Sequence, residues 1–534
     1  MSATPHAQLA ESTQVAVVKG AERNILIAMI TALVAVIGAM SGLNVAQQEL
    51  AIDHGASQGD VLWIINAYTV ALAALLLPVG AIGDRFGRKT VLLAGLAVFG
   101  FATVGAVLAT TTAMMIVARV VAGVGAAMIM PVTLSIVTTS FPPEDRAKAI
   151  GIWAGFAGGG AMIAMFISAF MVDVLTWRWV FALPLVLVVV SVVMTTLYAP
   201  NSKEASGHRF DTVGSVLSAL AIGGLVLGIH EGPEKGWSDP LTVVALIVGI
   251  VSVLCFVLWE RHQAEPLLDI SAFRDRGLAS GTVTLLIVFG VLFGVFLVLY
   301  PFFQAVLGWS ALLSAAAMLP LTVVMMPMSA IAPKIASRIG RRNTMVTGVA
   351  IFAGGLATMA LWASVEGGYM SVLPGLILIG FGMGLTMTPA TEAITETLPP
   401  EKQGVASALN DTSRELGGAV GIALLGSVLA AGYKSSIEPM LAGLPPELAE
   451  PAGEGIGAAF GVAARAGDQG PMIINAAKHA FVDGWVQSMW LGVGMAAVAL
   501  VFLLVRGPAR TTVARDEMRD AVPVPTEPLQ RVGN

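Results

Sequence analysis

Long apolar segments recur along the whole chain and constrain its fold more than any other feature. A membrane-spanning helix needs roughly twenty consecutive, mainly apolar residues. Apolar residues make up 56% of the sequence and charged residues 12%, whereas an ordinary soluble domain is about a quarter charged. We therefore expect an all-α membrane protein with fourteen spans: 25–47, 61–82, 91–110, 113–138, 149–172, 177–199, 211–230, 240–260, 278–306, 311–336, 344–364, 371–397, 403–431 and 485–506.

The loops between these segments alternate in positive charge. Cytoplasmic loops of membrane proteins carry an excess of Lys and Arg. With the N-terminus placed in the cytoplasm, 22 of the 29 basic residues fall on that side. The outside segments hold Arg178, Lys235, Lys434, Arg465 and Lys478, and the spans themselves hold Arg119 and Arg414. We expect a multi-pass protein of the cell membrane with both termini cytoplasmic.

Several classes of protein lack support in this sequence. The net charge of −5 suggests no nucleic-acid partner, and Cys255 is the one cysteine, so no disulfide framework or cysteine metal cluster can form. The six histidines are scattered, and no Gly-x-x-x-x-Gly-Lys-Ser/Thr phosphate-binding loop is present. We expect no enzyme, no cofactor, no metal and a monomer whose energy comes from an ion gradient.

A short charged motif occurs twice. Gly83-Asp84-Arg85-Phe86-Gly87-Arg88-Lys89 follows the second span, and Ala336-Ser337-Arg338-Ile339-Gly340-Arg341-Arg342 follows the tenth. Such internal repeats are common in transporters built from two halves around a central site. This predicts a cytoplasmic segment 1–24, a six-helix bundle 25–199, an inserted helix pair 211–260, a second six-helix bundle 278–506 and a cytoplasmic tail 507–534.

The second bundle contains one long extracellular loop, residues 433–484. Loops of this length are usually functional or disordered. We expect one or two short surface helices in it, and the sequence leaves open whether the loop is functional or a tolerated insertion.

Four motifs together resemble the major facilitator superfamily, in its fourteen-helix drug:proton antiporter branch. They are Gly83–Lys89, Arg119–Ala127, Trp177–Phe181 and Gly404–Gly418, and the resemblance extends over about residues 25–506. It implies two six-helix bundles of major facilitator type plus two inserted helices. It also implies export of small hydrophobic compounds (drugs, biocides, antibiotics) by proton antiport and alternating access. The alternatives are export of a lipid, siderophore or other metabolite, and an uptake symporter.

The resemblance assigns roles to two of the motifs. In the family the first hairpin latches the two halves on the cytoplasmic side, which makes Gly83, Asp84, Arg85, Gly87, Arg88 and Lys89 a candidate gating motif. A helix N-terminus favours a nearby negative charge such as Asp84. Arg119 is implied in substrate handling or proton coupling, because an arginine inside a span is costly unless it is paired or faces water. Snorkelling to the outer interface is the alternative.

The sequence departs from the family at acidic positions. Ala39 stands where the first span of relatives has Asp, and Asn66 stands where the second span often has Asp. The fifth-span motif also loses its Gly-Pro and Gly-Gly pairs at Ala164-Met165 and Ser168-Ala169. At 1.5 Å rise per residue, Ala39 and Arg119 lie at about the same depth. Arg119 would then face Asn44, Asn66, a water or the substrate, which favours neutral or anionic substrates over compact cations.

Few acids remain that could carry a proton. A coupling group must change charge during the cycle, and a carboxyl in a low-dielectric cavity can do so near neutral pH. The candidates are Glu392, Asp411 and Glu415, with Arg414 and Arg119 as cationic partners. We prefer Glu392, because no basic residue lies one turn away in sequence. Asp411, Arg414 and Glu415 share one helix face and either couple protons or brace the inner gate.

Aromatic and amide residues in two spans could line a substrate cavity. They are Trp63, Asn66 and Tyr68 in the second span, and Phe296, Tyr300, Phe303 and Gln304 in the ninth. Aromatic residues on helices are more often packing residues than ligands, so this assignment competes with simple core packing.

Overall fold

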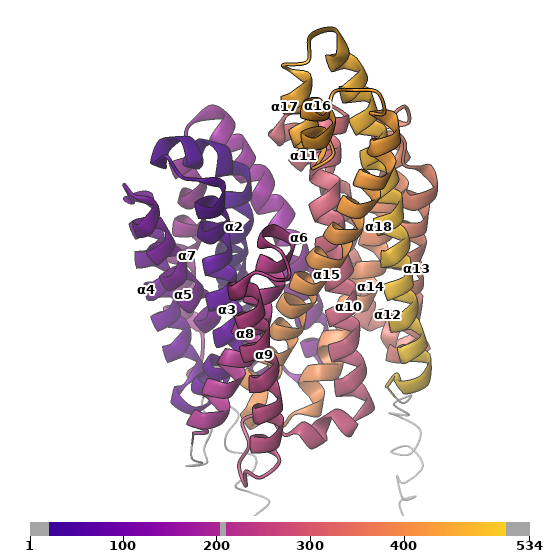
Figure 1. Cartoon of the computed structure of the whole chain (residues 1–534). Helices are drawn as coiled ribbons and strands as arrows, with labels where there is room; N and C mark the ends of the chain where they lie inside the picture. The colour runs from indigo at the N-terminus through magenta and orange to yellow at the C-terminus, as the bar shows by residue number, and fades with distance from the viewer. Residues whose placement is uncertain (1–20, 203–209, 509–534) are drawn as a thin grey trace, which may run out of the picture.

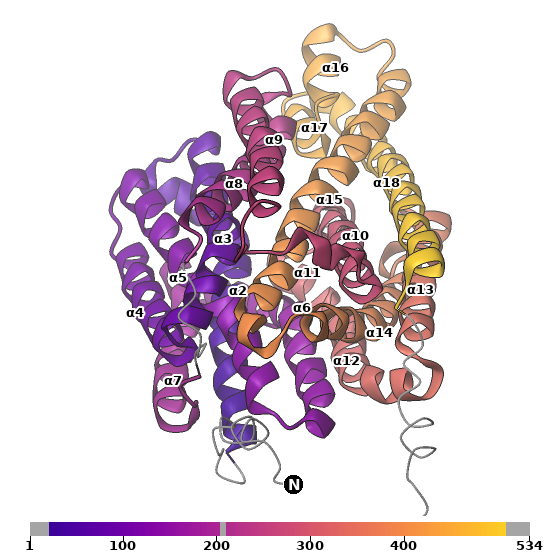
Figure 2. The ribbon, with the colours of Figure 1, turned by 90° about the horizontal axis from the view of Figure 1, so that it is seen from below.

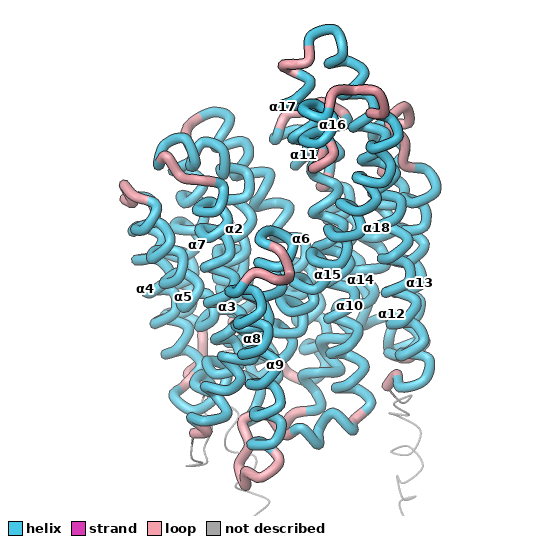
Figure 3. The backbone as a smooth tube through the Cα atoms, viewed as in Figure 1, coloured by secondary structure: helices cyan, strands magenta, loops and turns pink. Residues whose placement is uncertain are grey.

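The computed structural model describes residues 21–202 and 210–508, and these are organised as helices joined by short loops (Figures 1 and 3). Fourteen of the described helices are long and apolar enough to cross a membrane. This confirms the number of spans and a multi-pass membrane protein. The N-terminal segment up to residue 20, the tail from residue 509, and the loop residues Lys203 and Arg209 lie outside the described residues.

The first group of helices covers the start of the described chain. Its turns use ordinary local chemistry: Ser57 and Asp60 form a capping box before the second helix, and Gly55 ends the first in a left-handed conformation. The group comprises α2 (Glu22–His54), α3 (Gln58–Phe86), α4 (Arg88–Val107), α5 (Thr112–Ser140), α6 (Pro143–Val174), a 3₁₀ turn (Trp177–Phe181) and α7 (Ala182–Tyr198).

Two further helices, α8 (Thr212–Lys235) and α9 (Pro240–Glu260), form a hairpin beside the two groups. A Cβ on Gly224 would lie 2.8 Å from the Gly249 backbone nitrogen, so glycine permits their close approach. Within the pair, α8 packs against α3 of the first group and α15 of the second, and Figure 2 shows the pair beside the seam between the groups.

The second group has more interruptions than the first. The predicted span 311–336 is divided at Met318, just before a proline, into a short helix and a long one. The group comprises α10 (Arg276–Pro301) preceded by a 3₁₀ turn (Ile270–Arg274) and followed by a π turn (Phe302–Val306), α11 (Ala311–Ala317), α12 (Leu319–Ile339), α13 (Arg341–Trp362), a 3₁₀ turn (Gly368–Ser371), α14 (Leu373–Thr397), a 3₁₀ turn (Pro400–Lys402), α15 (Gln403–Met440) and α18 (Gly470–Arg506).

Much of the segment 433–484 is helical rather than loop. α15 continues to Met440 and α18 already begins at Gly470, and between them lie α16 (Pro446–Ala452), α17 (Ile456–Ala463) and a 3₁₀ turn (Gly467–Gln469). The buried Tyr433 hydroxyl donates to the Ala452 carbonyl at 2.9 Å. The expected spans 403–431 and 485–506 were therefore too short: the first helix ends later and the second begins earlier, because both extend into Gly-, Pro- and charge-containing sequence.

The two groups meet most closely at one end. In Figure 1 their ribbons converge at the end that carries both arginine-containing hairpins, which we call the hairpin end, and separate toward the end that carries α16 and α17, the loop end. Small residues allow the contact: a Cβ on Gly80 would lie 2.5 Å from the Gly404 carbonyl oxygen, and one on Gly151 would lie 2.6 Å from the Ser329 carbonyl oxygen. The helices of the two groups thus touch backbone to backbone near the hairpin end.

Candidate functional site

The first hairpin joins the two groups through one carboxylate. Asp84, at the end of α3, accepts hydrogen bonds from the Gly404 N–H at 2.8 Å and the Val405 N–H at 3.2 Å, in the first turn of α15. Its side chain is 4% exposed. α15 has no side-chain cap of its own, so Asp84 supplies the negative charge that a helix N-terminus favours. We call this contact the latch.

Arg88 completes the latch from the start of α4. Its Nη2 donates to Asp84 Oδ1 at 2.7 Å and to the Pro400 carbonyl at 2.9 Å. Gly87 between them has a φ of 104°, a conformation that favours glycine, and its position leaves no space for a Cβ beside Asn201. The remaining motif residues lie at the periphery: Lys89 donates to the Thr196 carbonyl of α7 at 2.9 Å, and Arg85 lies over the Phe86 ring.

The second hairpin places Arg341 next to two acids of α14. Arg341 Nε lies 3.4 Å from Glu392 Oε2, and its Nη2 donates to Glu396 Oε1 at 2.6 Å. Glu392 is buried, whereas Glu396 is exposed. The preference for Glu392 rested on the lack of a nearby basic residue in sequence, and the fold supplies one from 51 positions away. Glu396 contacts Arg341 with both carboxylate oxygens.

Arg119 is buried in the first group without an acidic partner among the described residues. Its Nε donates to the Ile64 carbonyl and its Nη1 to the Ala39 carbonyl, both at 3.1 Å. The guanidinium lies 4.2 Å from the centre of the Tyr68 ring, and Nη2 has no hydrogen-bond partner. The side chain is 1% exposed, so it does not snorkel. Arg119 therefore reaches the level of Ala39, as the depth argument predicted.

Asn66 faces the inserted helix pair instead of Arg119. Its Oδ1 lies 3.1 Å from Nδ1 of His230 on α8, and its Nδ2 is buried without a partner. Glu231, 1% exposed, forms an ion pair with Lys235 at 2.6 Å, and Lys235 lies 5.7 Å from the Trp63 ring. Trp63 and Asn66 thus belong to a polar contact between α3 and α8.

The three charged residues of α15 lie where α15 meets the first group. Arg414 donates to the Ala157 carbonyl of α6 at 2.9 Å and lies 4.5 Å from the centre of the Phe289 ring of α10. Asp411 is fully buried, and one of its oxygens lies 3.5 Å from Arg414 while the other has no partner. Glu415, one turn further along α15, is also buried. This cluster spans the seam between the groups.

The aromatic candidates of α10 and its π turn divide into two sets. Phe303 is fully buried and stacks on Trp309, with ring centres 5.7 Å apart, and beside Tyr369. Phe296 and Gln304 are half-buried. Tyr300, also half-buried, donates to the Ala311 carbonyl at 3.4 Å. Phe303 therefore has core packing partners, while the half-buried side chains keep part of their surface accessible.

The sequence analysis did not identify three groups that form the contacts described above. His230 gave no signal, because it lies 164 positions from Asn66. The role of Arg341 depends on α13 folding back against α14. The backbone N–H groups of Gly404 and Val405 carry no side-chain signature, although an uncapped helix start after Pro399 and Pro400 could have suggested that a group elsewhere satisfies them. No cluster of three or more His, Cys, Asp or Glu residues suited to a metal ion occurs in the described part of the chain.

The described residues form fourteen apolar helices, two of them (α8 and α9) beside two larger groups that an acid-to-helix latch joins at one end, and this arrangement defines a polytopic membrane transporter. The model of the Major Facilitator Superfamily matches residues 27–422. The chain belongs to this superfamily.

Similar proteins with curated names are resistance and efflux proteins. The chain is 30% identical to the multidrug resistance protein Stp of Mycobacterium tuberculosis over 400 residues, 75% of this chain and 74% of Stp. It is 32% identical to the puromycin resistance protein pur8 of Streptomyces alboniger over 72% of this chain and 77% of pur8. It is 30% identical to the methyl viologen resistance protein SmvA of Salmonella typhimurium over 87% of this chain and 93% of SmvA. The relationship to drug resistance transporters is therefore clear.

Solved structures confirm the fold. The human organic anion transporter MFSD10 superposes with a TM-score of 0.60 at 13% identity, over 90% of this chain and 99% of MFSD10. The proton:xylose symporter XylE superposes with a TM-score of 0.58 at 12% identity, over 92% of this chain and 96% of XylE. At such identities the likeness concerns the fold alone.

Proposed function

We propose that this chain exports small hydrophobic compounds across the cell membrane by alternating access, driven by proton antiport. The latch carries the proposal: one buried carboxylate holds the start of α15 against the end of α3. A contact of this kind can be made and broken as a unit while the two helix groups stay intact. The names of relatives, which include multidrug resistance and tetracenomycin C resistance and export, support drugs or antibiotics as substrates.

The direction of transport depends on orientation. We propose that the hairpin end is cytoplasmic, because the described hairpins concentrate arginine and lysine there. Both termini, with segments 1–24 and 507–534, then lie in the cytoplasm. Residues 25–199 and 278–506 act as the two moving bundles of a monomer, and the pair 211–260 accompanies them. The latch would close the cytoplasmic side in the arrangement described above.

Glu415 is our choice for the proton-carrying group. Glu392 and Glu396 share the cation of Arg341, and Asp411 lies next to Arg414 and Asn410. Glu415 is buried on α15, which packs against α3 and α5 of the first group, the helices that carry Tyr68 and Arg119. A carboxyl between two moving groups meets a different environment in each state, as proton coupling requires.

Arg119 supports a substrate preference. A buried cation without an acidic partner is costly, and its Nη2 has no hydrogen-bond acceptor. An anionic group or a neutral carbonyl would satisfy it, whereas a compact cation would be repelled. We propose that neutral and anionic hydrophobic compounds are transported in preference to organic cations.

Reconstituted proteoliposomes with an imposed pH gradient test both proposals. Three dyes of similar size, one anionic, one neutral and one permanently cationic, should show saturable flux that a protonophore abolishes, with the cation transported most slowly. Glu415→Gln should remove the dependence on the pH gradient while retaining exchange of substrate for substrate. Glu392→Gln is the matched control, since it removes a buried carboxyl of the same length on the neighbouring helix α14.

Three outcomes would count against these assignments. Flux that rises linearly with dye concentration would contradict a transporter mechanism. If Glu415→Gln kept the dependence of flux on the pH gradient and Glu392→Gln lost that dependence, Glu392 would be the proton-carrying residue. A strong preference for the cationic dye would defeat the role given to Arg119 and leave the export proposal intact.

A further inference from the structure

A basic pocket lies at the hairpin end of the second group, away from the seam. It encloses about 190 Å³ between the start of α10, the turn from α12 to α13 and the end of α18. Its lining contains three arginines and one asparagine and includes no acidic residue: Arg276, Ile339, Gly340, Arg341, Arg342, Asn343, Gly507 and Pro508. The pocket is therefore suited to an anion.

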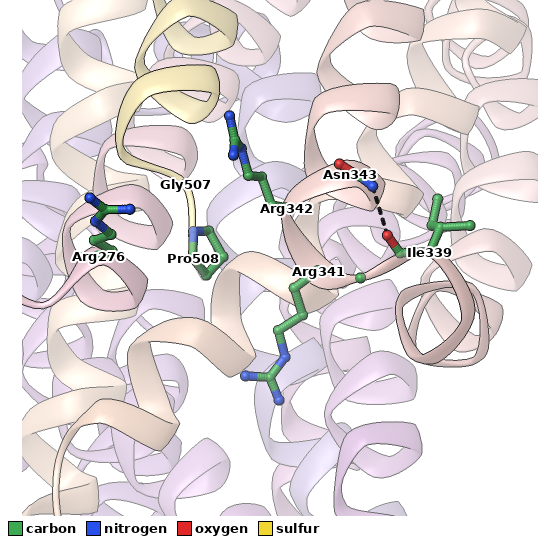
Figure 4. A pocket seen from close by; sticks show the side chains of 8 residues that line it. Arg276, Ile339, Arg341, Arg342, Asn343, Gly507 and Pro508 are labelled. Atoms are coloured by element: carbon green, nitrogen blue, oxygen red, sulfur yellow. Dashed lines mark hydrogen bonds between the residues drawn. The ribbon is translucent and has the colours of Figure 1, made fainter. Parts of the chain in front are cut away.

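The three arginines differ in what they can offer to a ligand. Arg341 turns away from the pocket toward Glu392 and Glu396 (Figure 4). Arg342 approaches the last turn of α18, where its Nε donates to the Leu503 carbonyl at 3.2 Å and its Nη2 to the Leu504 carbonyl. Arg276, on the opposite wall, has no hydrogen-bond or ion-pair partner for its side chain within the described residues. Arg276 and the remaining donor of Arg342 thus flank Gly507 and Pro508.

The acidic side chains near the pocket have partners outside its lining or are paired with Arg341. Asp275, adjacent to Arg276, accepts from the backbone N–H groups of Gly277 and Leu278 at 2.7 and 3.1 Å. Glu396 and Glu392 are engaged by Arg341. The turn at Gly340 also gives α13 no side-chain cap, so the first N–H groups of that helix add to the positive potential. A net positive charge therefore remains in the pocket.

An apolar surface leads from the membrane directly to this pocket. On the last two turns of α18, Val501, Leu504 and Val505 are 60%, 53% and 68% exposed. In a membrane such side chains contact acyl chains. Gly507 and Pro508 come immediately after the end of this span, where a membrane would have its lipid headgroups. A basic site at this depth beside exposed apolar helix surface suits a phosphate attached to acyl chains better than a soluble anion.

We propose that this pocket binds the phosphate of an anionic lipid headgroup, with Arg276 and Arg342 as its cationic ligands and the acyl chains along α18. The site is separate from the latch and lies away from the seam, so it stands whether or not the transport proposal holds. Free inorganic phosphate shares the same binding chemistry, and the test separates the two sources.

Native mass spectrometry of the purified, delipidated full chain would test the site. Phosphatidylglycerol should give a bound species that phosphatidylcholine of the same acyl length does not. Arg276→Gln should weaken phosphatidylglycerol binding by about fivefold, which corresponds to roughly 1 kcal/mol for one basic residue at an anionic surface. The control is Arg274→Gln. It removes the same charge two residues from Arg276, but the Arg274 side chain does not line the pocket, so this variant should bind phosphatidylglycerol as the wild type does.

Arg342→Gln removes hydrogen bonds to the end of α18, so Arg276→Gln is the deciding variant. It alters an exposed side chain without a described partner, and its melting temperature should equal that of the wild type. If inorganic phosphate at millimolar concentration displaces the lipid and binds alone equally well, the pocket is a site for soluble phosphate, and the lipid assignment fails. Equal binding of both lipids, or equal losses in Arg276→Gln and Arg274→Gln, would overturn the site itself.

Discussion

The two arginine-containing hairpins share a sequence pattern but make different contacts. In the first, Asp84 reaches α15 of the other helix group and is held by Arg88. In the second, Ser337 takes the position of Asp84, and its hydroxyl donates only to the Lys334 carbonyl at 2.9 Å. Arg341, the counterpart of Arg88, binds α14 within its own group. The hairpin that joins the two groups has an acidic residue at this position, and the hairpin that braces one group has a serine.

The two sides of the seam are consequently held by different forces. The side formed by α3 and α15 carries the charge-assisted latch, which depends on geometry. The side formed by α6 and α12 relies on close packing, with Gly151 against the Ser329 backbone and Gly158 against the Met325 side chain. Packing of small and flexible residues tolerates sliding, whereas the latch is either formed or broken. We therefore expect the latch to dominate the equilibrium between states.

The largest effect should come from Asp84→Asn. The amide keeps the size of the side chain but loses its charge, which leaves the buried Arg88 without an anion. Charge-assisted hydrogen bonds contribute about 1.5–3 kcal/mol each, so we expect substrate efflux to fall by about tenfold or more. Initial efflux rates at matched protein levels measure this. An efflux rate within twofold of the wild type would show that the latch is dispensable.

An intermediate effect should come from Arg341→Gln. This change should lower the stability of the fold more than it lowers the rate of transport. The change leaves Glu392, 2% exposed, without its cation. Because Arg341 is partly exposed, we expect a loss on the order of 2 kcal/mol, below the 3–5 kcal/mol typical of a broken buried pair. Thermal unfolding in detergent measures it, and a greater loss of transport than in Asp84→Asn would reverse the roles given to the two hairpins.

A double substitution sharpens that result. Adding Glu392→Gln to Arg341→Gln removes the buried acid that the single change leaves unpaired. Part of the lost stability should return, which a double-mutant cycle would reveal as coupling between the two positions. Strictly additive losses would mean that the 3.4 Å contact between Arg341 and Glu392 contributes little.

The smallest effect should come from Ser337→Ala. Its hydroxyl makes one local hydrogen bond within α12, and surface changes of this kind usually stay within about 0.5 kcal/mol. Efflux and melting temperature should match those of the wild type. A defect comparable to that of Asp84→Asn would mean that the second hairpin also takes part in joining the groups.

The sequence predicted the helices well, because lipid forces each span to be apolar. It missed the end of α15 and the start of α18, where both helices continue beyond the apolar sequence. In α15 the extension is stabilised because Tyr433 and Ile437 are buried. The first hairpin was predicted as a latch because its string of residues is specific. The pairings of Glu392 with Arg341 and of Asn66 with His230 could not be predicted. Each joins two separate helices and depends on how each helix is rotated about its own axis, which hydropathy does not encode.

Distance measurement between the two groups at the hairpin end tests the central claim most directly. Spin labels at Phe86, 60% exposed, and at the exposed Glu401 would report the separation of α3 from the start of α15, with Cys255 replaced by Ala. We predict one short, narrow distance for the chain with Asp84 in place, and a second, longer population in the Asp84→Asn variant or under a pH gradient with substrate. An identical single distance in all these conditions would contradict a latch that opens during transport.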